Sequence, residues 1–128
     1  QLARRGLQHL LDRLHPVAPL GYQEFLGLFA EAALAVSDSG GVQEEASVVK
    51  RPVAVVRRST ERPEVLGTFS VVAGVGAEIG IAATAWLDDP TAVHERLATV
   101  ASPYGDGDAS RLALDAMARM HLLGERRK

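Results

Sequence analysis

The alternation of apolar and polar positions along the chain predicts short strands separated by helices. Apolar runs at 34–36, 52–56 and 68–72 have the length and composition of buried parallel strands. Apolar residues at helical spacing predict helices over the segments 2–14, 22–33, 42–49, 78–87, 91–100 and 109–123. Because strands alternate with helices, we expect βαβ units, and therefore an α/β fold with an open parallel sheet flanked by helices.

The expected sheet is small, and the pattern of apolar positions also predicts which of its surfaces are covered. Its strands are apolar on both faces, so we expect both faces to be covered, while the sheet edges lack a neighbour. The last predicted helix carries an apolar side, and Gly124 is predicted to end it. This side consists of Leu112, Ala116, Met117, Met120 and Leu123.

Length and composition place the chain among globular domains. With 128 residues, of which 47% are hydrophobic, we expect one domain with a packed core over residues 1–128. The net charge of −2 gives no basic field, so we expect no nucleic-acid partner. No apolar run reaches the roughly 18 residues that span a bilayer, and we expect no membrane partner. The absence of cysteine excludes a disulfide scaffold or thiolate nucleophile and is compatible with a cytoplasmic location.

The turn at 37–41, here called the glycine turn, is the strongest local feature. It follows a predicted strand and opens a predicted helix, so its backbone N–H groups and the helix dipole suit a phosphate. Ser39 could add a hydroxyl, and Glu45, one turn further, could accept hydrogen bonds from ribose hydroxyls. On the residues alone, an ordinary N-capped turn is the more frequent outcome, since a Gly-Gly pair is not a full phosphate fingerprint.

Two further segments are candidates for the same edge of the sheet. The segment 57–64, here called the arginine loop, follows the strand at 52–56, and its arginines could either neutralise a diphosphate or pair locally with glutamates. The segment 19–25 follows an extended piece, and Phe25 could line a base pocket, although a place in the core is the commoner outcome. The four histidines are scattered without partner spacing, so we expect no metal, and no cofactor motif is present.

Taken together, four strings in this order and spacing resemble the UDP-N-acetylglucosamine 2-epimerase family. They are SDSGGVQEEA at 37–46, RPV at 51–53, TERPE at 60–64 and PYGDG at 103–107. The resemblance runs from about residue 14 to the end. It implies a Rossmann-like domain, part of the C-terminal half of a glycosyltransferase-B-type two-domain architecture. It also implies a reaction that interconverts UDP-N-acetylglucosamine and UDP-N-acetylmannosamine, in cell-surface polysaccharide biosynthesis.

The resemblance assigns the diphosphate of UDP to the glycine turn. By this match Ser39, Gly40 and Gly41 hold the diphosphate, and Arg62 contacts its phosphate side. The remaining implied contacts are to the nucleoside.

Glu45 is implied to bind the ribose, while Phe25 and the backbone near Leu20 are implied to border the uracil. The implied partners are therefore UDP and UDP-N-acetylglucosamine, and a homodimer is compatible with the resemblance, since family members are commonly dimers.

The family's chain is about three times this length, and its N-terminal domain carries the groups that move the C2 proton. The resemblance therefore implies that this chain binds UDP and contains no catalytic residue. It also implies that the chain is inactive without the missing N-terminal half or a partner chain. The alternatives are a non-catalytic module that binds UDP-sugars and an inactive remnant.

Overall fold

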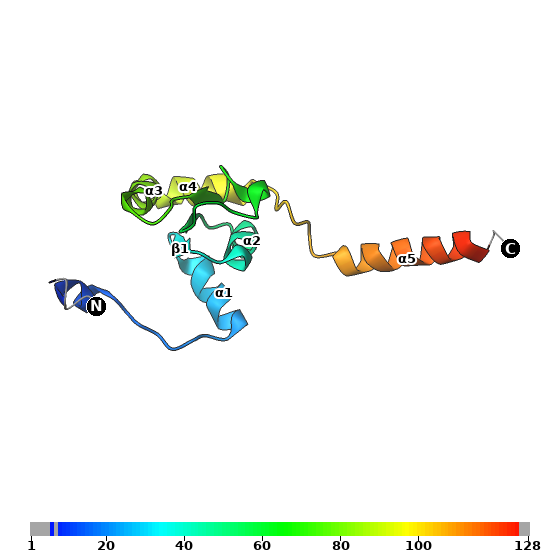
Figure 1. The fold of residues 1–128 in the computed structure, drawn as a ribbon, viewed down its shortest axis with the longest axis horizontal. Helices are drawn as coiled ribbons and strands as arrows, with labels where there is room; N and C mark the ends of the chain where they lie inside the picture. The colour runs from blue at the N-terminus through cyan, green and yellow to red at the C-terminus, as the bar shows by residue number, and fades with distance from the viewer. Residues whose placement is uncertain (1–5, 7, 126–128) are drawn as a thin grey trace.

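The computed structural model describes Gly6 and residues 8–125 (Figure 1). After the 3₁₀ helix η2 (Gln8–Arg13), an α/β arrangement runs from residue 22 onwards. Its elements are α1 (Tyr22–Glu31), β1 (Ala35–Ser37), α2 (Gly40–Val49), β2 (Val53–Val55), the 3₁₀ helix η3 (Pro63–Val65), β3 (Ser70–Val72), α3 (Ala77–Leu87), α4 (Pro90–Ala98) and α5 (Ala109–Glu125).

The strands form one parallel sheet, as predicted, and their order is β1-β2-β3. Ala35 pairs with Val53, and Val53 pairs in turn with Ser70, so the register is set by consecutive crossovers. All three residues of the central strand β2 are buried. In Figure 1, α1 and α2 lie on one side of the strands and α3 and α4 on the other.

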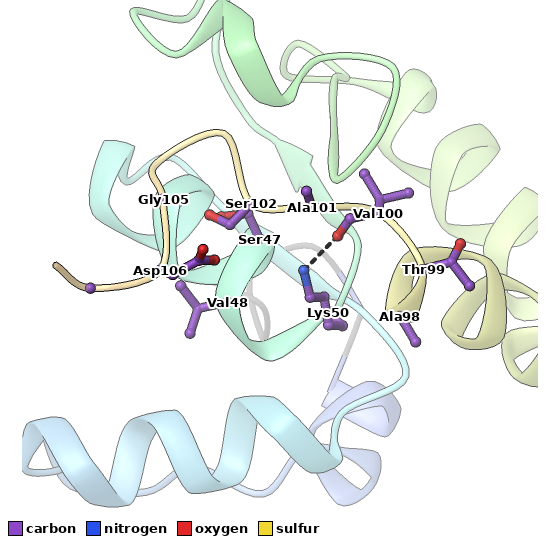
Figure 2. Close-up of a pocket in the computed structure, with 11 residues that line it drawn as sticks. Ser47, Val48, Lys50, Ala98, Thr99, Val100, Ala101, Ser102, Gly105 and Asp106 are labelled. Atoms are coloured by element: carbon purple, nitrogen blue, oxygen red, sulfur yellow. Dashed lines mark hydrogen bonds between the residues drawn. The ribbon is translucent and has the colours of Figure 1, made fainter.

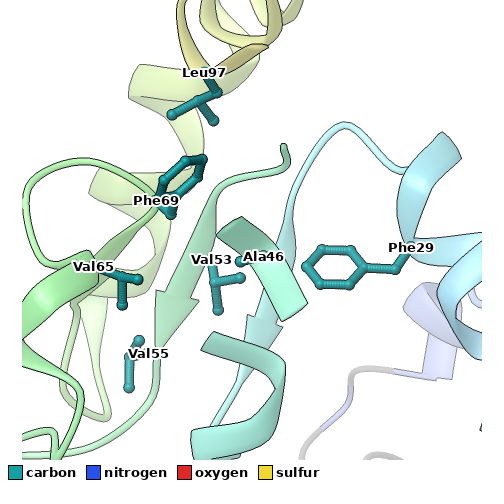
Figure 3. Packing of buried hydrophobic residues seen from close by; sticks show 7 residues of the cluster. All are labelled: Phe29, Ala46, Val53, Val55, Val65, Phe69 and Leu97. Carbon is teal, nitrogen blue, oxygen red and sulfur yellow. The ribbon is translucent and has the colours of Figure 1, made fainter. Parts of the chain in front are cut away.

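The core is a small cluster that joins both helical layers to the sheet (Figure 3). Phe29 from α1 and Ala46 from α2 pack toward β2, while Leu97 from α4 packs near Phe69. The cluster consists of Phe29, Ala46, Val53, Val55, Val65, Phe69 and Leu97. Leu97 and Phe69 have no exposed surface, so this part of the chain has the dense packing of a protein interior.

Element boundaries differ from the expectation by a few residues. α1 ends at Glu31 because Ala32 already has extended backbone, and α5 continues through Gly124 to Glu125 instead of ending there. The arginine loop, expected to be a turn, contains η3, which begins at Pro63. The helix expected over 2–14 falls partly outside the described residues, and η2 occupies its second half.

The expectation that both faces of the sheet are covered was wrong at β1, where Val36 is 50% exposed. Within the described residues β1 pairs only with β2, so it is an edge strand, as expected. α5 extends away from the other elements in Figure 1, and Leu112, Met117 and Met120 on its apolar side are 53–72% exposed. The side chain of Leu123 lies outside the described residues. None of the helices in the described part of the chain has the length and hydrophobicity that crossing a membrane requires.

Candidate functional site

The glycine turn joins the carboxyl end of β1 to the first turn of α2, as the sequence predicts. Ser39 is the N-cap, and its Oγ accepts the N–H of Val42 at 3.4 Å. The N–H of Ser39 itself donates to Ser37 Oγ at 3.1 Å. The first turn of α2 carries no acidic side chain, so its partial positive charge is not neutralised from within the helix.

The arginine loop lies against the glycine turn, which confirms that the two segments share one edge of the sheet. A Cβ atom on Gly40 would lie only 2.7 Å from Glu61 Oε1 and 4.0 Å from Arg62 Cζ. At Gly41 a Cβ atom would meet only Ser39 Oγ, at 3.7 Å. The side chains of Glu61 and Arg62 therefore lie close to the backbone of Gly40.

Arg62 is held by contacts on both sides of this edge. Its Nε donates to Glu44 Oε1 of α2, and its Nη1 donates to the backbone carbonyl of Glu61 at 3.2 Å. The hydrogen bond with Glu44 raises the pKa of the Arg62 guanidinium, and the charges of Glu44 and Glu61 add to the effect. Both side chains keep a third or more of their surface exposed, so the pair orients the guanidinium without removing it from solvent.

The second pair of the arginine loop is local. Arg57 Nη1 donates to Glu61 Oε2 at 2.6 Å. The pKa of Glu61 is held below its usual value, first by a hydrogen bond to its own backbone N–H and then by Arg57. Arg57 therefore pairs with a glutamate inside the loop, whereas Arg62 pairs with Glu44 of α2. The diphosphate alternative for this loop stays a prediction.

A buried amide links the same two segments and was missed from the sequence. Gln43 has no exposed surface; its Nε2 donates to the Ser39 carbonyl at 3.2 Å, and its Oε1 accepts from Thr60 Oγ1 at 2.5 Å. Thr60 Oγ1 also accepts the N–H of Arg62 at 3.0 Å. The available signal was the spacing, because Gln43 lies one turn after the N-cap on the same helix face as the buried Ala46 and Ser47.

Glu45 points away from Glu44 and toward α1. It is half-buried, and its charge and a hydrogen bond raise the pKa of the Tyr22 hydroxyl, after the larger effect of partial desolvation of that hydroxyl. Tyr22 is the first residue of α1 and is 64% exposed. A ribose-binding carboxylate would thus stand next to an exposed phenol that the sequence analysis did not single out.

The two residues implied for the uracil lie on either side of the start of α1. Leu20 precedes the helix and is 40% exposed. Phe25 is half-buried, packs against the core and has its ring centroid 5.8 Å from that of Phe29. The core reading of Phe25 therefore holds in the structure, and part of its surface remains available. Within the described residues, no hydrogen bond or ion pair links Leu20 or Phe25 to the glycine turn.

The PYGDG string contributes one aromatic group to this edge. The pKa of Tyr104 is raised first by burial of its hydroxyl and then by the charges of Glu64 and Glu44. Tyr104 therefore lies near the Glu44–Arg62 pair, with 39% of its surface exposed. Tyr104 of the PYGDG string therefore lies at the same edge of the sheet as the SDSGGVQEEA and TERPE strings.

A separate hollow of about 590 Å³ lies at the other end of α2 (Figure 2). Lys50 Nζ donates to the Val100 carbonyl at 2.6 Å, and the hydroxyls of Ser47 and Ser102 share a hydrogen bond of 2.8 Å. Asp106 from the PYGDG string completes one wall. No residue predicted to bind UDP lines this hollow, so it is distinct from the candidate site at the glycine turn.

Comparisons with known proteins bear on this site. A family model described as UDP-N-acetylglucosamine 2-epimerase matches residues 1–118. The UDP-N-acetylglucosamine 2-epimerase of Neisseria meningitidis is 35% identical over 121 residues, an alignment that covers 91% of this chain and 32% of that protein. The Bacillus subtilis UDP-N-acetylglucosamine 2-epimerase is 37% identical over 108 residues, covering 83% and 28%.

Solved structures that are similar to this chain also belong to UDP-N-acetylglucosamine 2-epimerases. The S. aureus MnaA–UDP co-structure superposes with a TM-score of 0.76 and 32% identity, over 94% of this chain and 33% of that one. The Neisseria meningitidis epimerase bound to UDP-GlcNAc gives a TM-score of 0.71 and 30% identity, over 91% and 33%. The chain thus spans about a third of the relatives it matches. The expected fold class, a Rossmann-like parallel sheet within a glycosyltransferase-B-type architecture, is confirmed.

Proposed function

Because this chain belongs to the UDP-N-acetylglucosamine 2-epimerase family, we propose that it is the UDP-binding part of such an epimerase. The whole enzyme would interconvert UDP-N-acetylglucosamine and UDP-N-acetylmannosamine. A proton leaves C2 of the sugar, the bond from C1 to UDP breaks, and a glycal and UDP result. The proton then returns to the opposite face of C2, and UDP adds back to C1.

The observation that carries the proposal is the meeting of the glycine turn with Arg62. The first turn of α2 begins at Gly40, and a Cβ atom placed there would lie 4.0 Å from the Arg62 guanidinium carbon and 2.7 Å from Glu61 Oε1. Preorganised donors of this kind, helix N–H groups and a guanidinium, suit a diphosphate, whose charge grows as the bond to C1 breaks. In this scheme Ser39, Gly40 and Gly41 bind the diphosphate, and Arg62 neutralises it.

The nucleoside would extend from this point toward α1. Glu45 lies one turn further along α2 and would accept hydrogen bonds from the ribose hydroxyls, while Leu20 and Phe25 would border the uracil. The exposed faces of both apolar residues support this placement. Holding UDP through the glycal stage is itself part of catalysis, because an escaped UDP could not add back.

We expect the chain by itself to bind UDP without turning over the sugar. In the family, the groups that move the C2 proton belong to the domain that this chain does not match. A chain that binds UDP-sugars and gains no turnover from any partner would instead be a non-catalytic module. A folded chain that binds no uridine nucleotide would be an inactive remnant.

The decisive experiment is calorimetric titration of the chain with UDP and with UDP-N-acetylglucosamine. We expect saturable binding that Arg62→Ala and Glu45→Ala both weaken. Arg111→Ala is the matched control, because Arg111 is an exposed arginine of α5 that pairs only with Asp108 and Asp115 among the described residues. Absence of binding by the folded wild-type chain, or equal losses in all three variants, would contradict the proposal.

A further inference from the structure

Arg62 and the glycine turn are joined by a directional chain of hydrogen bonds. The N–H of Arg62 donates to Thr60 Oγ1 at 3.0 Å, and the Thr60 hydroxyl donates to Gln43 Oε1 at 2.5 Å. The amide of Gln43 then donates to the carbonyl of Ser39 at 3.2 Å. Each group donates in the same direction, so the bonds polarise one another and strengthen cooperatively.

Burial makes this series of hydrogen bonds rigid. Gln43 has no exposed surface and Thr60 is half-buried, so water cannot easily replace the partner of either group. A buried amide that loses a partner is costly, and the network therefore favours one geometry. The Arg62–Glu44 pair is more exposed, so it can orient the guanidinium but fixes the backbone of the loop less firmly.

This series of hydrogen bonds begins and ends at the two halves of the proposed diphosphate site. Ser39 is the N-cap of α2, and Arg62 is the proposed cationic contact on the neighbouring loop. The arginine loop enters the site after β2, whereas the glycine turn enters it after β1. Within the described residues, two side-chain hydrogen bonds link α2 to the arginine loop, the one between Thr60 and Gln43 and the more exposed one between Arg62 and Glu44.

We infer that Thr60 and Gln43 are positioning residues that set Arg62 at the correct distance from the first turn of α2 for a diphosphate. This inference rests on the proposed function, since it specifies how the UDP site is assembled. Neither residue touches the nucleotide in this arrangement. Their effect should therefore be specific to ligands that carry the diphosphate and should act through Arg62.

The test compares Thr60→Val with Thr60→Ser in the full chain. Valine keeps the shape of threonine but lacks the hydroxyl, whereas serine keeps the hydroxyl. We expect Thr60→Val to raise the Kd for UDP about tenfold, which corresponds to about 1.4 kcal/mol. Thr60→Ser should stay within about twofold of wild type, and the weak affinity for uridine, measured by NMR titration, should be the same in all three proteins.

A double-mutant cycle separates positioning from general damage. In an Arg62→Ala background, Thr60→Val should change the Kd for UDP by less than about twofold, because the group that it positions is gone. If Thr60→Val fails to fold, Thr60→Ala, which leaves room for water without a fixed hydroxyl, takes its place with the same expected result.

The possible outcomes are distinguishable. Wild-type affinity for UDP in Thr60→Val overturns the inference and leaves the proposed function intact. Equal weakening of uridine, or an undiminished effect in the Arg62→Ala background, also overturns it by assigning Thr60 a merely structural role. A wild-type chain that binds no UDP overturns the proposed function and the inference together.

Discussion

Substituting Gly40 by alanine separates folding from binding in a way that the structure makes quantitative. Gly40 is the first residue of α2, and it is not among the glycines with positive φ. An alanine can therefore adopt its backbone conformation without strain. The new methyl carbon would lie 2.7 Å from Glu61 Oε1 and 3.6 Å from Glu61 Cδ.

For the free chain the cost of Gly40→Ala is small. The contact is about 0.7 Å shorter than an ordinary approach of 3.4 Å, but the atom that it meets is the end of a flexible, half-exposed glutamate. The carboxylate can swing aside, and alanine has the better helix propensity, by at most about 1 kcal/mol. We expect the free energy of unfolding to change by no more than about 0.5 kcal/mol.

For the complex the cost is large. A phosphate oxygen must come within about 3 Å of the first amides of α2, and a methyl group at Gly40 occupies that approach. Loss of one charge-assisted hydrogen bond removes about 1.5–3 kcal/mol, which is roughly 10- to 150-fold in Kd. We therefore expect Gly40→Ala to weaken UDP binding at least tenfold.

Urea unfolding and calorimetric titration with UDP, run on the same preparations, test both halves of this reasoning. Gly80→Ala is the matched control, because Gly80 lies within α3 and a Cβ atom there meets nothing within 4 Å. This control should gain stability and bind UDP like wild type. Tight UDP binding by Gly40→Ala would refute the assignment of the diphosphate to this turn.

Three further predictions concern the core and Glu61. Leu97→Ala removes a side chain with no exposed surface from the cluster in Figure 3, and urea unfolding should show a loss of about 2–5 kcal/mol. Glu61→Gln removes a negative charge beside Gly40, so the Kd for UDP should fall, whereas Glu64→Gln should change it less. Because the pKa of folded Glu61 is below its usual value, its pairing stabilises the chain above that usual value and is lost as acid titrates the folded carboxyl. The stability difference between wild type and Glu61→Gln should therefore shrink as the pH falls below about 4, and a constant difference would contradict this.

The sequence predicted the sheet and its helices well because their signals are local. The run at 52–56 is apolar on both faces, and β2 is indeed buried at every position. The exposure of the apolar side of α5 could not be predicted in this way. Periodicity shows that Leu112 and Met117 share a face, but it cannot show whether a partner for that face is present in the chain.

The sequence predicted that the glycine turn and the arginine loop share one edge of the sheet, but it predicted only part of the hydrogen bonding between them. Strand order places both turns at one edge, so the meeting of Gly40 and Arg62 follows from topology. The partner of Arg62 does not follow, since the arginine loop contains nearer glutamates and the choice of Glu44 depends on side-chain geometry. Gln43 was missed because a glutamine in a polar helical string looks exposed unless the neighbouring loop is known.

Pairing between strands that follow one another in the sequence also shapes how this chain reaches its fold. Ala35 lies beside Val53 and Val53 beside Ser70, so each pairing closes a loop of fewer than about twenty residues. Chain entropy lost on closing such loops is modest, and folding rates depend strongly on this sequence separation. Each new strand finds its template in the strand synthesised just before it, so the sheet can grow from β1 to β3 as the chain emerges from the ribosome.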